Sequence, residues 1–175
     1  MTTVQTVQKA IPVQRLLSAD AYQRIDRELA KYPPEQAQSA VMASLAIAQD
    51  EIGWISPAVI EDIAGYLGMA PVAVYEVATF YNMYNTREVG TFKIGVCTCL
   101  PCALRQGDRA GEYLKEKLGI DYGETTPDGR FTLVETECLG ACADAPICLV
   151  NDKRVESFMD NAKLDALIDE LRNED

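Results

Sequence analysis

The stretch FKIGVCTCLPC at residues 92–102 and its counterpart FTLVETECLGAC at residues 131–142 decide how this chain folds. Each begins with a run of residues typical of a β-strand and continues into a loop that carries cysteines. If the two strands are neighbours in one sheet, both loops emerge at the same edge. Four thiolates then converge there, spaced C-x4-C in the first loop and C-x3-C in the second: Cys97, Cys102, Cys138 and Cys142.

The spacing of these cysteines favours a [2Fe-2S] cluster. Such a cluster has two tetrahedral irons that each take two protein thiolates, so two loops with one pair each supply one loop per iron. A structural zinc site usually prefers C-x2-C knuckles, which only Cys99 and Cys102 offer. From the spacing alone, zinc and redox-active thiols stay open as alternatives. In the plainest interpretation, Cys99 and Cys148 are leftover buried cysteines.

Patterns around the two loops predict a small α/β sandwich. Residues 107–119 between the loops are expected to form a helix, and the segments PICLVN and RVESF are typical of paired strands. Asp160 stands where it can cap a final helix. The predicted order of elements is therefore β-α-β-β-α.

The first half of the chain predicts a small helical bundle. Near residue 86 the pattern changes from helix to strand. We therefore expect an α+β protein: a helical bundle over residues 1–86, which carries no chemistry and serves docking, and an α/β domain over residues 87–175. The aromatic stretch Phe80, Tyr81 and Tyr84 is expected to be core or interdomain packing. Apolar residues recur at helical spacing in 18–32, 35–53 and 57–67 and onward from Pro71.

The composition excludes several classes of function. Among 175 residues, 16 are Lys or Arg and 27 are Asp or Glu, a net charge of -11 that offers no basic surface to nucleic acid. The sequence has no histidine, which removes Ser-His and Cys-His catalysis, His-ligated haem, Rieske-type iron and Cys2His2 zinc. The first residues resemble neither a signal peptide nor a transit peptide, and no apolar run suggests a membrane span, so we expect a cytoplasmic chain with reduced thiols.

Motifs for organic redox cofactors are absent from the sequence. No G-x-G-x-x-G follows a predicted strand, and there is no phosphate-binding P-loop. We therefore expect the chain to bind neither a nicotinamide nor a flavin. A one-electron cluster in such a chain must receive its electrons from another chain or from a soluble donor.

The chain also resembles a known family. CTCLPCALRQGDRAGEYLKEKLGI followed by FTLVETECLGACADAPICLVN is similar to the thioredoxin-like [2Fe-2S] subunit of respiratory NADH:quinone oxidoreductase, complex I, which is the E subunit in bacteria. GWISPAVIEDIAGYLGMAPVAVYEVATFYNMYNTREVG resembles that family's helical N-terminal region, so the resemblance runs from about residue 35 onward. The sequence departs from the family at two positions, Cys99 and Cys148. The resemblance places the cluster ligands on Cys97, Cys102, Cys138 and Cys142.

The resemblance implies a thioredoxin-like fold for residues 87–175 and one-electron transfer by a [2Fe-2S] cluster in an NADH-oxidising module. The implied partners are the flavin- and NADH-binding subunit and the large iron–sulfur subunit of the peripheral arm. The chain is then part of an enzyme but, alone, an electron carrier that does not oxidise NADH. Its implied place is the cytoplasmic side of the bacterial plasma membrane, reached through the complex and without direct insertion.

Three alternatives remain beside this interpretation. The first is an equivalent subunit of an NAD(P)-linked hydrogenase or formate dehydrogenase. The second is a free [2Fe-2S] ferredoxin that shuttles electrons. The third is a zinc-stabilised interaction domain, which a visible absorption spectrum distinguishes because zinc thiolates are colourless.

Overall fold

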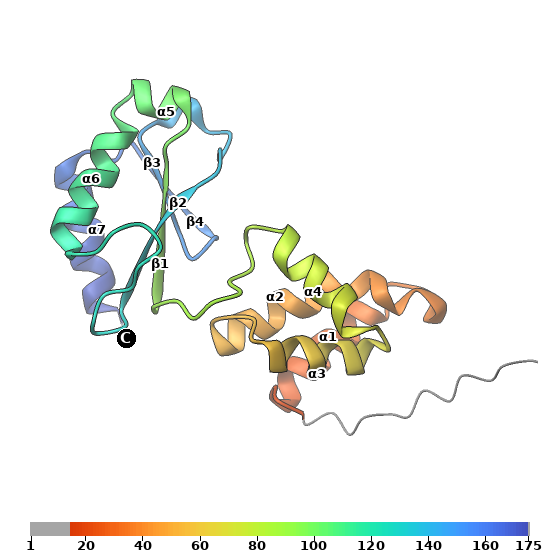
Figure 1. The fold of residues 1–175 in the computed structure, drawn as a ribbon. Coiled ribbons are helices and arrows are strands. Elements are labelled where there is room, and N and C mark those ends of the chain that lie inside the picture. Colours follow the sequence, from red (N-terminus) through yellow and green to blue (C-terminus); the bar gives the residue numbers. More distant parts are fainter. Residues whose placement is uncertain (1–14, 175) are drawn as a thin grey trace, which may run out of the picture. The chain divides into compact units, whose positions relative to one another are not determined.

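The computed structural model describes residues 15–174 and divides the chain between Glu88 and Val89 into two compact units (Figure 1). The first unit, called here the helical unit, consists of helices in its described part. The second, the sheet unit, holds a four-stranded sheet with helices. The predicted α+β class, with helices first and a sheet after them, is confirmed.

The helical unit is built from short helices with clear start and stop signals. Ser18 and Ser56 each accept a backbone N–H from the first turn of the helix that follows, at 3.2 Å in both cases. Gly53 and Gly68 end helices in the left-handed region, with φ of 93° and 67°. The elements are α1 (Ala19–Leu29), η1 (Pro34–Ala40), α2 (Val41–Ile52), α3 (Pro57–Leu67) and α4 (Pro71–Phe80).

Two expectations for this unit are met only in part. The helix predicted over 35–53 is divided into η1, a 3-10 helix that is kinked inside at Gln36 with φ -116° and ψ 27°, and the α-helix α2. Among the aromatic residues expected to pack in the core or between the domains, Tyr84 is buried in the core, but Phe80 is 80% exposed and lies outside the core of this unit. Helix α4 ends at Phe80, and Tyr81 turns into extended backbone. The aromatic stretch is therefore divided between the core and the surface.

The sheet unit contains the strands β1 (Phe92–Cys97), β2 (Phe131–Thr136), β3 (Ile147–Val150) and β4 (Arg154–Ser157). Their order is β2-β1-β3-β4; β1 and β2 are parallel, and the other two pairings are antiparallel. The parallel pair is connected through α6 (Gly107–Leu118), and α7 (Asn161–Asn173) follows β4. The predicted hairpin and the predicted cap at Asp160 are confirmed, since its carboxylate accepts the N–H of Lys163 at 2.9 Å.

The core of the sheet unit lies between the sheet and its two long helices. Figure 1 shows α6 and α7 on the same side of the sheet. Alternate residues of a strand face one side of the sheet, so every second residue of β1 faces these helices. Burial of these side chains fixes the position of the sheet against the helices. The core includes Phe92, Ile94, Val96, Leu114, Phe131, Leu133, Leu164 and Ile168.

The register of the parallel pair places both cysteine loops at one end of the sheet. Phe92 pairs with Phe131, and the ladder continues to Cys97, which pairs with Thr136. Both strands therefore stop at the same level, where their loops begin. Within residues 15–174, none of the helices has the length and apolar character needed to cross a membrane.

Candidate metal centre

The first cysteine loop is compact and largely buried. Cys97 is the last residue of β1 and is 1% exposed, and Cys102, also 1% exposed, lies in the short helix α5 (Leu100–Leu104). Cys99 precedes this helix as its N-cap residue in extended geometry and is half-buried. The sequence patterns did not predict α5. Its five residues are too few for a periodic signal, although the Pro at its start is a typical helix-start residue.

A glycine holds the next helix against this loop. A Cβ added at Gly107 would lie 2.8 Å from the carbonyl oxygen of Cys97 and 2.9 Å from that of Cys102. Any larger residue would push α6 away from the backbone that carries both thiols. Gly107 is therefore a structural determinant of the first loop, and its importance is visible in the structure rather than in the sequence pattern.

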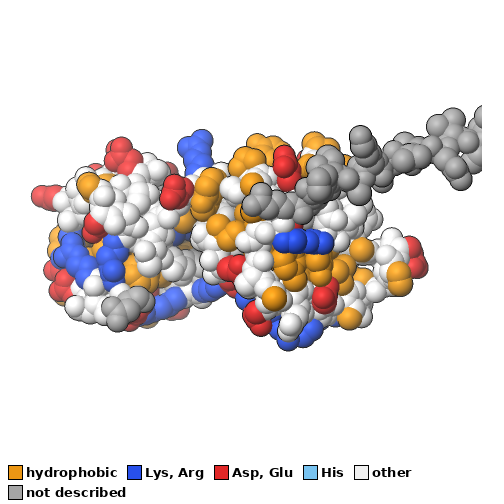
Figure 2. Space-filling view, turned by 90° about the horizontal axis from the view of Figure 1, so that it is seen from below, with side chains coloured by type: hydrophobic (Ala, Val, Ile, Leu, Met, Phe, Trp, Pro, Cys, Tyr) orange, Lys and Arg blue, Asp and Glu red, His pale blue; other side chains and the backbone are white. Residues whose placement is uncertain are grey.

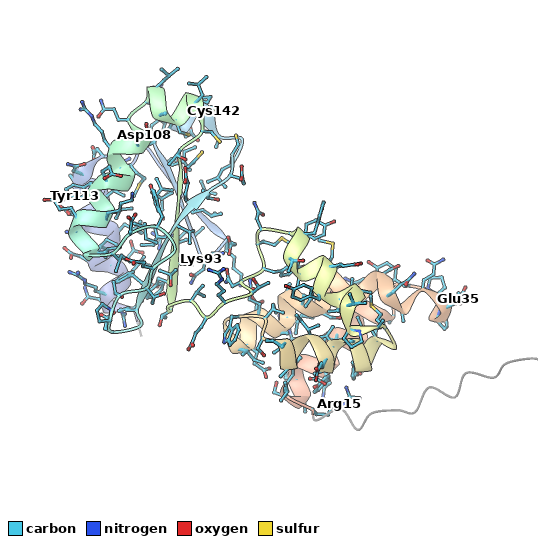
Figure 3. All side chains as sticks on the ribbon, in the orientation of Figure 1. Arg15, Glu35, Lys93, Asp108, Tyr113 and Cys142 are labelled. Atoms are coloured by element: carbon cyan, nitrogen blue, oxygen red, sulfur yellow. The ribbon has the colours of Figure 1, made fainter. Side chains whose placement is uncertain are left out.

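The second cysteine loop is more exposed than the first. Cys138 is exposed, Cys142 is half-buried in the short η2 (Cys142–Asp144), and between them Gly140 has φ 72°. The end of this loop is tied to the segment after β4, because Phe158 donates its N–H to the carbonyl of Asp144 at 2.7 Å. Figure 3 places Cys142 at the end of the sheet unit where α5 lies.

The thiols of the two loops form one network. The thiol of Cys97 contacts those of Cys99 and Cys102, and Cys99 also contacts Cys138. Cys102 interacts electrostatically with Cys142. The structure thus brings the four cysteines predicted as ligands together, with Cys99 among them. That these four bind iron stays a prediction.

Backbone N–H groups favour the anionic form of one thiol. Burial raises the pKa of Cys97, but the N–H of Cys99, the thiol of Cys102 and the N–H of Leu139 together outweigh it and hold the pKa below its ordinary value of 9.0. Leu139 belongs to the second loop and Cys97 to the first, so this contact also joins the two loops. A negatively charged sulfur at Cys97 is the form that binds a metal.

Two neighbouring thiols are shifted in the opposite direction. Burial, followed by the nearby thiols, raises the pKa of Cys102 to about 12. Burial and the charges of Cys97 and Cys138 raise the pKa of Cys99 to about 11. Both thiols hold their protons when no metal is bound, so metal binding at Cys102 must release a proton.

The donor set fits a binuclear iron–sulfur cluster. All six cysteines are free thiols, and the four predicted ligands supply the two thiolates per iron that a [2Fe-2S] cluster requires. No group of three or more His, Cys, Asp or Glu side chains among residues 15–174 is arranged to hold a single metal ion. Cys148 belongs to a different environment, fully buried in β3 among the core residues that face α6 and α7.

The rim of the centre carries features that sequence reasoning missed. The hydroxyl of Thr98 donates to the carboxylate of Glu135, which ties the first loop to the end of β2. On α5, Leu100 and Leu104 are 73% and 77% exposed. Exposed leucines one helical turn apart are a typical signal of a contact surface, and the spacing of these two could have indicated it.

Comparison with known sequences identifies relatives over most of the chain. The model of the thioredoxin-like [2Fe-2S] ferredoxin family matches residues 25–172. The E subunit of the NADH-quinone oxidoreductase of Rickettsia bellii is 46% identical over 145 residues, which cover 82% of this chain and 86% of that protein. NADH-quinone oxidoreductase subunit 2 of Thermus thermophilus is 42% identical over 148 residues, covering 85% of this chain and 82% of that protein.

A mitochondrial relative is longer than this chain. NADH dehydrogenase [ubiquinone] flavoprotein 2 of Dictyostelium discoideum is 42% identical over 151 residues, and the match covers 86% of this chain but 61% of that protein. Among solved structures, an NAD+-reducing [NiFe]-hydrogenase in its air-oxidised state has a TM-score of 0.67 at 22% identity and covers 75% of this chain and 22% of that chain. This structural match concerns the fold alone. The sequence matches confirm the resemblance inferred from the cysteine segments.

Proposed function

The chain belongs to the thioredoxin-like [2Fe-2S] ferredoxin family, and on that premise we propose that two pairs of cysteines, one from each loop, ligate its cluster. Its cofactor is a [2Fe-2S] cluster, and the chain is an electron-transfer component of an NADH-oxidising oxidoreductase. When bound, the cluster takes up and releases one electron at a time. The proposed ligands are Cys97 and Cys102 for one iron and Cys138 and Cys142 for the other.

The observation that carries this proposal is the convergence of two loops at the ends of adjacent parallel strands. The thiols of Cys97 and Cys102 contact each other within the first loop, as expected for two ligands of one iron. The thiols of Cys102 and Cys142 interact between the loops. The N–H groups of Cys99 and Leu139 donate to Cys97 and stabilise negative charge on its sulfur, which favours reduction.

Alanine variants of the four cysteines test the ligand set. We expect each of Cys97→Ala, Cys102→Ala, Cys138→Ala and Cys142→Ala to lose most of its iron and acid-labile sulfide after anaerobic purification, because alanine offers no donor atom. Cys148→Ala is the matched control and should retain two irons and two sulfides per chain. A full cluster in any of the four variants would contradict the ligand assignment.

The relatives are subunits of larger assemblies, so the chain works with partner subunits. More specifically, the proposed electron donor is a flavin- and NADH-binding subunit, and the large iron–sulfur subunit of the peripheral arm is a further neighbour. This chain, taken alone, is an electron carrier that does not oxidise NADH, since its sequence contains no dinucleotide fingerprint. A flavin in the partner must divide the electron pair of NADH into single electrons.

The surface of the helical unit supports a docking role for residues 1–86. Figure 2 shows hydrophobic side chains gathered on the surface of this unit. On α4, Val72 and Tyr75 are more than half exposed, and Phe80 is almost fully exposed. Exposed apolar side chains in such number mark a protein contact. We expect this α4 face to bind the flavin subunit.

A double substitution on α4 tests this docking role in the full chain. Tyr75→Ser/Phe80→Ser should retain the cluster and its visible spectrum but lose co-purification with the flavin subunit, because the apolar contact area is removed. Tyr32→Ser, at an exposed aromatic residue just beyond α1, is the matched control. Equal recovery of the flavin subunit by the α4 variant and by the control would refute the docking role of α4.

The proposed location is the inner face of the bacterial plasma membrane, where the chain is held through the complex. Its support is the similarity to NADH-quinone oxidoreductase subunits, together with the absence of a membrane-crossing helix within residues 15–174. In cell fractionation we expect the chain to sediment with membranes when its partners are present and to remain in the supernatant when the flavin subunit is deleted. Sedimentation without that subunit would contradict the proposed attachment.

A further inference from the structure

A side-chain hydrogen bond connects the first cysteine loop to the strand that leads into the second. Thr98, directly after the last residue of β1, donates its hydroxyl to the carboxylate of Glu135 in β2. Thr98 lies one residue after Cys97, and Glu135 lies three residues before Cys138. In the proposed ligand set, these two cysteines bind different irons. We call this hydrogen bond the Thr98–Glu135 tether, because it joins the supports of the two halves of the centre.

The tether continues the connection between β1 and β2 where their backbone ladder ends. Val96 pairs with Glu135 one step before the last pair of the ladder, which contains Cys97. Alternate residues of a strand face the same side of a sheet, so Thr98 follows Val96 on the side that carries Glu135. Val96 belongs to the core that faces the helices, whereas Cys97 belongs to a separate buried cluster at the metal centre. The tether therefore acts on the backbone of both loops and leaves the sulfur of Cys97 free for a metal.

The second loop has more need of such a restraint than the first. The first loop is held by the close contact with Gly107. In the second loop, Cys138 is exposed, and Gly140 has φ 72° with open space around it. A [2Fe-2S] cluster requires the two cysteine pairs to stay at one separation, because each pair binds one of its two irons. Holding the end of β2 against the first loop limits changes in that separation.

The chemistry of the two groups suits a tether. An ionised carboxylate only accepts hydrogen bonds, and a threonine hydroxyl can donate one. A hydrogen bond with a charged acceptor is stronger than one between neutral groups. The side chain of Thr98 is half-buried and that of Glu135 is exposed, so substitutions at these positions disturb the core of the sheet unit little.

We propose that Thr98 and Glu135 are positioning residues that hold the two cysteine loops at the separation the cluster requires and thereby slow its loss. This inference rests on the proposed function, because it presupposes the ligand set given above. It assigns a role in cluster retention to two residues outside that set. Removal of the tether leaves all four ligands in place, so its effect is faster loss of the cluster rather than failure to form it.

Substitutions at both ends test the tether in the full chain with its cluster. Thr98→Val keeps the shape of the side chain but removes the hydroxyl, Thr98→Ser keeps a hydroxyl donor, and Glu135→Ala removes the acceptor. Thr125→Val is the matched control. It makes the same chemical change and breaks a contact of 2.7 Å between the hydroxyls of Thr125 and Thr132, at the opposite end of β2.

The measurements are iron and sulfide per chain, the EPR spectrum of the reduced cluster, and the rate at which the visible absorption decays anaerobically in excess EDTA. We expect every variant to form a cluster with two irons and two sulfides. Decay should be about twofold to tenfold faster in Thr98→Val and in Glu135→Ala, the range for one lost hydrogen bond. The double variant Thr98→Val/Glu135→Ala should decay no faster than either single variant, because both remove the same contact.

Thr98→Ser and Thr125→Val should decay at the wild-type rate. Wild-type decay in Thr98→Val and Glu135→Ala would overturn the proposal. Decay as fast in Thr98→Ser as in Thr98→Val would also overturn it, because the hydroxyl would then have no part in the effect. Equal acceleration in Thr125→Val would do the same, since the effect would then report a general loss of stability. If Thr98→Val does not fold, the exposed Glu135→Ala decides by itself.

Failure of the proposed function has a different signature. If the wild-type chain, reconstituted anaerobically with iron and sulfide, shows neither the visible absorption nor the EPR signal of a [2Fe-2S] cluster, the function itself is wrong. A wild-type cluster whose decay does not respond to loss of the tether refutes only the positioning role of Thr98 and Glu135.

Discussion

The two units of this chain differ in the residues that they place at their surfaces and loops. The sheet unit places cysteine thiols at the end of a parallel strand pair, and the close approach at Gly107 fixes one of its loops. The helical unit contains no cysteine, has an apolar core and exposes aromatic and aliphatic side chains on α4. In the proposed function, electron transfer and partner recognition are assigned to separate units. A substitution in one unit should therefore change one property and spare the other.

The polar anchors of the two units also differ. In the helical unit, the carboxylate of Asp62 is 1% exposed, accepts the N–H of Leu16 at 3.1 Å and the hydroxyl of Tyr22, and lies 3.6 Å from the guanidinium of Arg15. That guanidinium also stacks over the rings of Tyr22 and Tyr66, at 5.0 and 4.5 Å from their centroids. This anchor fixes the start of the described chain against α1 and α3. In the sheet unit, the comparable anchor is the largely buried Lys93 of β1, whose ammonium lies 2.5 Å from the carboxylate of Asp152.

The largest expected effect comes from breaking the Asp62 anchor. Asp62→Ala leaves a partly buried hydroxyl, an N–H and a half-exposed guanidinium without their acceptor and should destabilise the helical unit by about 3 kcal/mol. The free energy of unfolding can be measured by denaturant titration, with iron content followed in parallel. Iron content should stay at the wild-type level. Loss of iron in Asp62→Ala would show that the two units are not separate in function.

Asp50→Ala is the control for this prediction. Asp50 forms a surface ion pair with Arg24 at 3.5 Å, and both side chains are more than a third exposed. Such pairs contribute about 0–1 kcal/mol. If Asp50→Ala lowered the free energy of unfolding as much as Asp62→Ala, burial of the Asp62 carboxylate would not explain the larger predicted effect.

The converse test is in the sheet unit, at Gly107. In Gly107→Ala, the added Cβ meets the carbonyl oxygens of Cys97 and Cys102, and overpacking of this kind costs about 1–3 kcal/mol. Because the clash is with the backbone of two proposed ligands, we expect iron content to fall while binding of the flavin subunit through α4 persists. Iron analysis and a pull-down assay with the flavin subunit measure the two properties.

Gly123→Ala separates this clash from ordinary backbone strain. Gly123 has φ 83° and open space around its Cα, so its substitution strains the backbone without touching the cysteines. We expect it to keep its full iron content. Equal iron loss in the two glycine variants would remove the special role of Gly107.

Much of this architecture was predictable from the sequence, and the reason is local chemistry. The Ser56 and Gly68 caps and the final helix after Asp160 follow from residue types within a few positions. The predicted convergence of the cysteine loops required β1 and β2 to be neighbours in the sheet, and they form a parallel pair. Helix α5 was missed because five residues carry no periodicity. The kink at Gln36 was missed because the apolar spacing that predicted this helix begins only at Val41 and gives no information on the residues before it.

The remaining features depend on contacts between distant segments. The close contact of Gly107 is with the backbone of the preceding strand and loop. The hydrogen bonds of Asp62 join α3 to residues 15–22. The contact of Cys99 with Cys138 requires both loops to be in place. The cysteine spacing indicated which thiols would converge. It did not indicate that Cys99 would stand between the loops.

A smaller effect is expected at alkaline pH from one tyrosine in each unit, the buried Tyr84 and the partly buried Tyr122. Burial raises the pKa of Tyr84 in the helical unit and of Tyr122 in the sheet unit to about 12, from an ordinary value of 10.0. A raised tyrosine pKa stabilises the folded form fully below pH 10. This stabilisation is lost as the pH rises from 10 toward 12.

Phenylalanine variants of the two tyrosines show which unit loses stability between pH 10 and 12. Tyr84→Phe also removes a hydrogen bond of 2.8 Å to the carbonyl of Met42, so it should lower stability at neutral pH while weakening the fall above pH 10. Tyr122→Phe should weaken the fall in the sheet unit. Unfolding followed by far-ultraviolet circular dichroism between pH 8 and 12 measures both, and an unchanged pH dependence in both variants would contradict the assignment.

The smallest effect distinguishes the surface ion pairs of the two units. In the sheet unit, Arg154 makes two contacts with the carboxylate of Glu170, at 2.6 and 3.1 Å, and so connects β4 to α7. In the helical unit, Arg24 and Asp50 make a single contact at 3.5 Å. A bidentate arginine–carboxylate pair is more specific in geometry than a single contact, but both pairs are exposed and screened by salt.

Glu170→Gln should therefore lower the midpoint of thermal unfolding by less than about 3 °C in low salt, and the shift should be smaller in high salt. Asp50→Asn should lower the midpoint by a smaller amount than Glu170→Gln does. Differential scanning calorimetry at two salt concentrations measures both shifts. A larger shift for Asp50→Asn than for Glu170→Gln would show that bidentate geometry gives the sheet unit no advantage over the helical unit.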